Sequence, residues 1–178
     1  MESLIIHVET AGGGNQADVL KSIFGDLNCL VEVVASSSVY RVLEDNAHNG
    51  ARSPVSHFAQ GHLCVALKAK SAQAPIDLSH KFILLARQHA TAARQKFVHI
   101  RLLTYGSKTL MHPQLTLPDP DLHRRAALLV PCAEVWANYQ HPILSATLGE
   151  LVENMVGEPW GEFYAQGKAL LDSSLQVP

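Results

Sequence analysis

The stretch KFVHIRLLTYG, residues 96–106, constrains the fold of this chain more than any other part of it. It predicts a β-strand, because β-branched and aromatic residues run for about nine positions before a glycine stops them. Successive side chains of a strand point to opposite faces, so Val98, Ile100 and Leu102 share one face. The other face is then formed by Phe97, His99, Arg101, Leu103 and Tyr105.

His99 and Arg101 lie side by side in the middle of that second face. An unpaired guanidinium is costly to bury, so this face is expected to meet a cleft, a partner charge or solvent. An anionic ligand and an ion pair with Asp119 or Asp121 satisfy Arg101 equally well. For His99, a structural role is favoured over metal ligation. The functional site is therefore expected around these two residues.

Hydrophobic periodicity predicts the other elements of the chain. Strands are expected at residues 4–9, 29–42, 62–70 and 109–112, and helices from Asn15 to Gly25 and over residues 76–93. The order strand–helix–strand–strand–helix–strand predicts a ferredoxin-like α+β domain. In that arrangement two helices cover one face of an antiparallel sheet, and the other face, with His99 and Arg101, stays available for ligands.

Residues 1–156 are expected to form one domain. Residues 157–178 contain Trp160, Phe163 and Tyr164, too many aromatic residues for a linker, and are expected to pack on the domain or on a partner. The net charge of −2 gives no general electrostatic reason to bind nucleic acid or a membrane. Three widely spaced cysteines are interpreted as reduced core or near-core residues, and the absence of an N-terminal signal pattern predicts a cytoplasmic protein.

Several motifs between Ser36 and Val152 fall at the spacing of a known family. They are Ser37–Arg41 (SSVYR, family pattern S-S-x-Y-R), Val65–Leu67, Thr104–Gly106, and Leu115–Pro118 followed by Asp121, Arg125, Leu129, Pro131 and Glu134. In these residues the chain resembles hydroxymethyldihydropterin pyrophosphokinase, a transferase of folate biosynthesis. The resemblance implies a ferredoxin-like fold, ATP and Mg²⁺ as cofactors, and 6-hydroxymethyl-7,8-dihydropterin as the acceptor of the pyrophosphoryl group.

The chain departs from that family at the residues that hold the metal. The resemblance implies two aspartates at the strand positions occupied here by His99 and Arg101. Carboxylates two residues apart in a strand point the same way and can bridge two Mg²⁺ ions. Arg101 cannot ligate a metal, and a neutral His99 suits softer ions than Mg²⁺. The sequence therefore predicts no metal site at these positions.

Other implied positions are also altered. The family's His-Pro becomes Asp119–Pro120, its pterin-stacking Phe becomes Ala127, and its pterin-reading Asn falls at or near His62. Its basic loop is shortened to residues 91–96. The implied phosphate or nucleotide contacts are Arg94, Lys96, Arg101, Asp119 and Arg125, and the implied pterin-pocket positions are His62 and Ala127.

The favoured interpretation is a divergent pyrophosphokinase relative with weak or no activity that retains a ligand- or partner-binding role. Its ligand would be a nucleotide or a pterin-like small molecule. One alternative is an active pyrophosphokinase with rearranged metal ligands. Another is a single-stranded RNA-binding module, which needs exposed aromatic residues on the sheet and for which only Phe97 and Tyr105 are available.

Overall fold

The computed structural model describes residues 1–12, 15–42, 62–93, 95–155 and 160–172. The elements in chain order are β1 (Glu2–Gly12), α1 (Gln16–Leu30), β2 (Glu32–Ser36), β3 (Val39–Val42), β4 (Leu63–Ser71), α2 (Pro75–Ala92), β5 (Gln95–Tyr105), β6 (Leu110–His112), β7 (Leu115–Leu117), α3 (Ala126–Trp136), α4 (Leu148–Glu153), β8 (Gly161–Ala165) and α5 (Gly167–Asp172). None of the helices in these ranges is long and apolar enough to cross a membrane.

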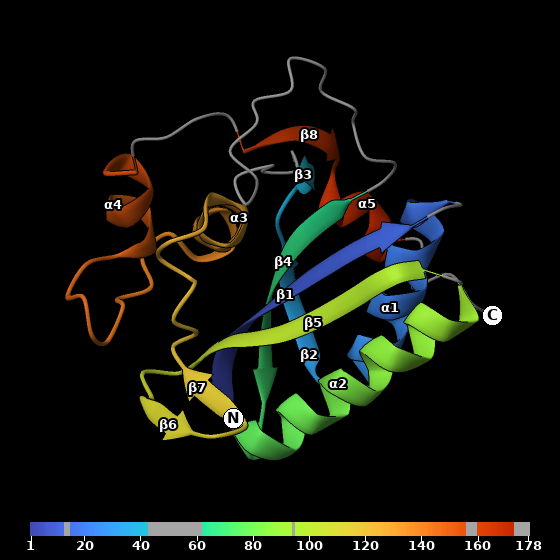
Figure 1. Ribbon diagram of the computed structural model, residues 1–178. Coiled ribbons are helices and arrows are strands. Elements are labelled where there is room, and N and C mark those ends of the chain that lie inside the picture. Colours follow the sequence, from blue (N-terminus) through green and yellow to red (C-terminus); the bar gives the residue numbers. More distant parts are fainter. Residues whose placement is uncertain (13–14, 43–61, 94, 156–159, 173–178) are drawn as a thin grey trace, which may run out of the picture.

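The main sheet has the strand order β5-β1-β4-β3-β8, with β2 also paired to β4 (Figure 1). Every pairing between these strands is antiparallel. Strand β4 therefore lies between β1 and β2, and β1 lies between β4 and β5, as in two interlocked split β-α-β units. The predicted ferredoxin-like α+β fold is confirmed.

Two apolar cores lie on opposite faces of this sheet. On one face, α1 and α2 pack on alternate residues of the strands, among them Leu4, Ile6 and Val8 of β1. On the other face, α3 and α4 pack on Ile5 and Leu103 in a smaller core. The second face was expected to stay available for ligands, but α3 and α4 cover one end of it, because the helical segment after β7 is apolar enough to need a core of its own.

The alternation predicted for β5 holds as far as Leu103, which lies on the face of His99 and Arg101 as expected. Ile6 pairs with Leu102 but Ile5 pairs with Thr104, so Leu103 is an extra residue in the strand. Such a bulge reverses the faces of the residues that follow it. Tyr105 therefore lies in the core beneath the helices, and the prediction that it shares a face with His99 is wrong. Its hydroxyl donates a hydrogen bond to the Gln73 carbonyl oxygen at 2.6 Å.

The strand predicted at residues 29–42 starts later than expected, because helix α1 continues to Leu30, and it is divided into the two strands β2 and β3. The break comes at Ser37, whose N–H donates to the Ala66 oxygen at 2.8 Å and whose Oγ accepts from the Ala66 N–H at 2.9 Å. A side-chain hydroxyl thus replaces one backbone partner between β2 and β3. Cys29 lies exposed near the end of α1, whereas Cys64 and Cys132 are buried, so the prediction that all three are core or near-core residues is wrong for Cys29.

The last described elements extend the sheet at the edge opposite β5. Strand β8 pairs with β3, and α5 contacts α1 and β2. A Cβ atom at Gly167 would overlap the Ser37 carbonyl oxygen and Ser36 Oγ, so α5 starts where only a glycine fits against the link between β2 and β3.

Candidate functional site

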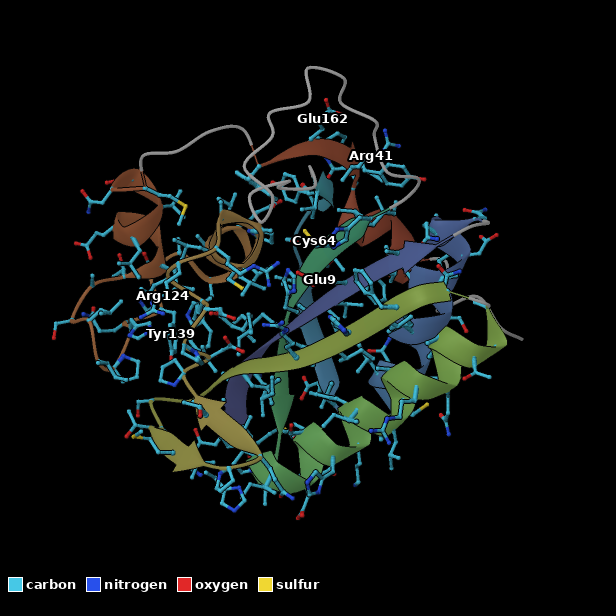
Figure 2. All side chains as sticks on the ribbon, in the orientation of Figure 1. Glu9, Arg41, Cys64, Arg124, Tyr139 and Glu162 are labelled. Atoms are coloured by element: carbon cyan, nitrogen blue, oxygen red, sulfur yellow. The ribbon has the colours of Figure 1, made fainter. Side chains whose placement is uncertain are left out.

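A buried carboxylate, Glu9 on β1, is the centre of charge on the sheet face that α3 partly covers. Figure 2 shows it beside Cys64, its pairing partner on β4. Its side chain is only 4% exposed, and its carboxylate oxygens lie 3.5 Å from Arg125 Nη2 and 3.8 Å from both His7 Nδ1 and His99 Nδ1. Sequence reasoning missed Glu9, because its pairing across the sheet with His99 depends on strand register.

Glu9 remains ionised in spite of its burial. Burial by itself would raise the pKa of Glu9, but the interaction with the His99 ring and the electrostatic effects of His7, Arg125 and His62 together lower it to about 2. These contacts are long compared with good charge-assisted hydrogen bonds, which are about 2.8 Å. The negative charge of the carboxylate is therefore stabilised by neighbours that lie too far away to form short hydrogen bonds with it.

His7, on the same face of β1, is a neutral imidazole. Burial lowers its pKa to about 4, against the opposing effect of Glu9. Nε2 lies 2.9 Å from the Ala127 carbonyl oxygen, which can only accept, so Nε2 carries the proton. Nδ1 is then a bare acceptor, and it is buried without a hydrogen-bond partner among the described residues. His7 thus ties β1 to the start of α3 and was not identified from the sequence.

Arg101 is ion-paired on the same face. Its Nη1 lies 3.6 Å from Asp121 Oδ2 and 3.9 Å from Asp119 Oδ2. The Asp119 N–H donates to the Leu103 carbonyl oxygen at 2.9 Å, and this bond fixes the loop after β7 against β5. Of the two roles considered for Arg101, the geometry corresponds to the ion pair, although its side chain remains 31% exposed.

The remaining residues singled out from the sequence occupy different places. Arg125 is the residue before α3 and is 39% exposed above Glu9. Ala127 is buried, and its carbonyl oxygen, the partner of His7, also accepts a 3.6 Å contact from Cys64 Sγ. Arg94 lies outside the described residues, and of Lys96 only the backbone is described.

Three rings form an aromatic group beside the charged cluster. The Phe97 ring stacks on His99 with a centroid distance of 4.8 Å and an interplanar angle of 23°. The His62 and Phe97 rings form a T-shaped pair, with a centroid distance of 5.2 Å and an interplanar angle of 85°. His99 therefore sits between a buried carboxylate and a half-exposed aromatic surface, since its own side chain is 51% exposed.

The donors on this face do not fit a pair of Mg²⁺ ions. Mg²⁺ needs an octahedral set of oxygen ligands, whereas β5 offers an imidazole at 99 and a guanidinium at 101. The nearby carboxylates already face cationic or imidazole groups. Across the described ranges, no three His, Cys, Asp or Glu side chains are grouped so as to hold a metal ion.

The SSVYR motif has a structural task that its sequence alone did not disclose. Glu134 on α3 accepts hydrogen bonds from the Ser38 N–H at 2.9 Å, from Ser38 Oγ at 2.8 Å and from the Tyr40 hydroxyl at 2.9 Å. Burial and the Glu134 carboxylate raise the pKa of Tyr40 to about 12. The hydrogen bonds between the SSVYR motif and Glu134 thus hold α3 over the sheet and thereby position Arg125 and Ala127.

No protein-family model matches the chain. It is 26% identical over 152 residues to 2-amino-4-hydroxy-6-hydroxymethyldihydropteridine pyrophosphokinase of Synechocystis sp., a match that covers 80% of this chain and 73% of that protein.

The fold is similar to that of solved Plasmodium falciparum HPPK-DHPS chains. The wild-type structure with pterin and p-hydroxybenzoate matches with a TM-score of 0.63 at 10% identity, over 85% of this chain and 41% of that one. The wild-type structure with SDX-DHP gives the same TM-score and identity, over 86% and 43%. The chain thus spans about two fifths of these solved chains. In sequence the chain is thus similar to a 2-amino-4-hydroxy-6-hydroxymethyldihydropteridine pyrophosphokinase, and in fold it is similar to the solved HPPK-DHPS chains.

Proposed function

We propose that this chain is a divergent pyrophosphokinase homologue that binds a nucleotide or pterin-like small molecule and transfers pyrophosphate weakly or not at all. One observation carries the proposal. Arg101 occupies the strand position at which the resemblance implies a metal-binding aspartate, and it is ion-paired with Asp119 and Asp121. The positive charge that a metal would supply there belongs to the protein itself.

The remaining chemistry of the face suits an anion with a flat ring. Arg101 and Arg125 are partly exposed, and their nearest carboxylate oxygens lie 3.5–3.9 Å away. A phosphate group can therefore gain shorter, charge-assisted hydrogen bonds from them. The stacked Phe97 and His99 rings offer a π surface to a heterocycle. These groups support binding without requiring a metal ion.

The two alternatives fit the structure less well. An active enzyme with rearranged ligands needs a cluster of carboxylates, and the described residues provide none with room for a metal. An RNA-binding face needs stacking aromatics on the central strands. Phe97 is on the open face, but Tyr105 is only 3% exposed beneath the helices. One of the two aromatic residues on which the RNA alternative depended is therefore not available.

Arg125→Gln is expected to weaken binding of a non-hydrolysable ATP analogue by roughly 10–100-fold, the value of one charge-assisted hydrogen bond. Arg124→Gln is the matched control, because it removes the same charge from an exposed position next to Arg125 in the sequence. Figure 2 shows Arg124 away from Glu9, near Tyr139. Calorimetry with the analogue and with 6-hydroxymethylpterin measures both variants. Equal losses in the two variants, or no binding of either ligand to the parent protein, would contradict the proposal.

A further inference from the structure

The outer edge of β5 ends the sheet. Within the described chain β5 pairs only with β1, and α2 runs alongside it (Figure 1). A terminal strand presents a row of N–H and C=O groups that another extended chain can pair with. The ladder between β5 and β1 is free of register shifts from Phe97 to Leu102. A regular six-residue template is therefore available at this edge.

A groove of about 510 Å³ runs along this edge, between β5 and α2. Its α2 wall includes Ile83, Ala86 and Ala90, and its β5 wall extends from Phe97 to Arg101. Ile83 is 41% exposed there. Apolar side chains of this size on a helix surface, next to an open strand edge, mark a place where a partner can bury area.

The two sides of the groove differ in chemistry. Val98 and Ile100 point to the α2 side of the sheet, where the wall is apolar, and His99 and Arg101 point to the opposite side. A strand added to β5 continues the pleat, so its side chains alternate between these two environments. Residues on the first side meet alanine and isoleucine, and residues on the second side meet a guanidinium and an imidazole.

The charge of the groove selects its occupant. Its lining contains Arg87, His99 and Arg101 and no carboxylate. The carboxylates that face His99 and Arg101 lie outside the groove lining, at 3.6–3.9 Å from these two side chains. Arg87 makes no ion pair with any residue that the structure describes, and the one acid of α2, Asp77, is in the first turn of that helix. The sequence of β5 itself carries Lys96, His99 and Arg101 and no acid. A second copy paired through the same edge would therefore oppose like charges, which destabilises a strand pair.

We propose that the outer edge of β5, with its groove beside α2, binds an extended peptide in which acidic and apolar residues alternate. The added strand pairs with the backbone of Phe97–Leu102. Its apolar side chains lie over Ile83 and Ala86, and its carboxylates face Arg101 and His99 across the sheet edge, with Arg87 at the rim of the groove. This is the strand-addition mode of peptide recognition. It shares Arg101 and His99 with the charged face, but it does not require that a small molecule binds there.

The probe is a fluorescein-labelled peptide of sequence Glu-Val-Glu-Val-Glu-Val-Glu, and its binding is measured by fluorescence anisotropy. A peptide of identical composition in block order, Glu-Glu-Val-Val-Val-Glu-Glu, tests the alternation. The alternating peptide is expected to bind at least about tenfold more tightly, because only it places each residue type in its own environment. Equal affinities would overturn the proposal, as would the absence of binding.

Two further comparisons test the groove and the backbone pairing. Ile83→Glu is expected to weaken binding at least about tenfold, because the valines of the bound peptide lie over Ile83, while Ile143→Glu, the same change at an exposed isoleucine between α3 and α4, leaves it unchanged. A strand added to one edge uses only alternate N–H groups, so of two peptides N-methylated on opposite registers one must bind and the other fail. If both bind alike, or if light scattering shows a dimer that protects the β5 amides from exchange, the proposal is wrong.

Discussion

Release of AMP from ATP, with 6-hydroxymethyl-7,8-dihydropterin as acceptor, is expected to be absent or about 10³–10⁴-fold slower than in an ordinary enzyme. Phosphoryl transfer depends on positioning and on neutralising negative charge. The face around Glu9 supplies cationic side chains that are already ion-paired. A loss of ~5 kcal/mol of transition-state stabilisation corresponds to this decrease in rate. The assay is run at high enzyme concentration, and turnover near 1 s⁻¹, the low end of ordinary enzymes, would contradict the prediction.

A double variant tests whether the residues at positions 99 and 101 alone, apart from the rest of the site, account for the loss of activity. His99→Asp combined with Arg101→Asp restores the pair of strand carboxylates that the resemblance implies. No recovery of AMP release is expected, because Ala127 cannot stack on a substrate ring and its buried position leaves its carbonyl tied to His7. Substrate orientation then still fails. Magnesium-dependent AMP release from this variant would show that the two strand residues alone account for the divergence.

The free energy of unfolding is expected to decrease by about 3 kcal/mol between pH 6.5 and pH 4 because of His7 alone. Burial lowers the pKa of His7 to about 4 in the folded protein, whereas in the unfolded chain the imidazole titrates near 6.5. Between these values the unfolded state binds a proton that the folded state does not, so stability rises with pH across this window and is level above it. Below pH 4 both states carry the proton.

His7→Gln isolates this effect. The glutamine amide can still donate to the Ala127 carbonyl oxygen, but it does not titrate. Urea unfolding at several pH values should show that the stability of the parent protein relative to the variant falls by about 3 kcal/mol from pH 6.5 to pH 4. His141, whose pKa is also lowered by burial, titrates in both proteins and cancels in the comparison. Parallel pH profiles would show that His7 is not buried as a neutral imidazole.

Local rules of strand structure predicted much of the architecture. Alternation placed His99 and Arg101 on one face, and the cost of an unpaired guanidinium predicted an acidic partner, with Asp119 and Asp121 named among the choices. Tyr105 was misplaced because a bulge at Leu103 leaves no mark in hydrophobic periodicity. Bulges follow from tertiary packing, here the contact of Leu103 with the core under α3.

The centre of the site was not predictable in the same way. His7 and Glu9 alternate with Ile6 and Val8 in β1. That alternation is equally typical of a strand whose polar side faces solvent and of one whose polar side is buried. Their burial depends on α3, which returns over the sheet much later in the chain: Arg125, just before α3, is 116 residues after Glu9. The register that pairs His7 with Arg101 and Glu9 with His99 comes from the assembled sheet.

Calorimetric titration of ATP, with and without Mg²⁺ at constant ionic strength, tests the central claim most directly. If Arg101 and Arg125 supply the positive charge of the site, free ATP and its Mg²⁺ complex should bind with dissociation constants within about threefold of each other. In that case Arg101 would pair with the phosphate oxygens directly and would gain nothing from a metal bound beside it. A tenfold or larger gain in affinity on adding Mg²⁺, about 1.4 kcal/mol, would contradict the account.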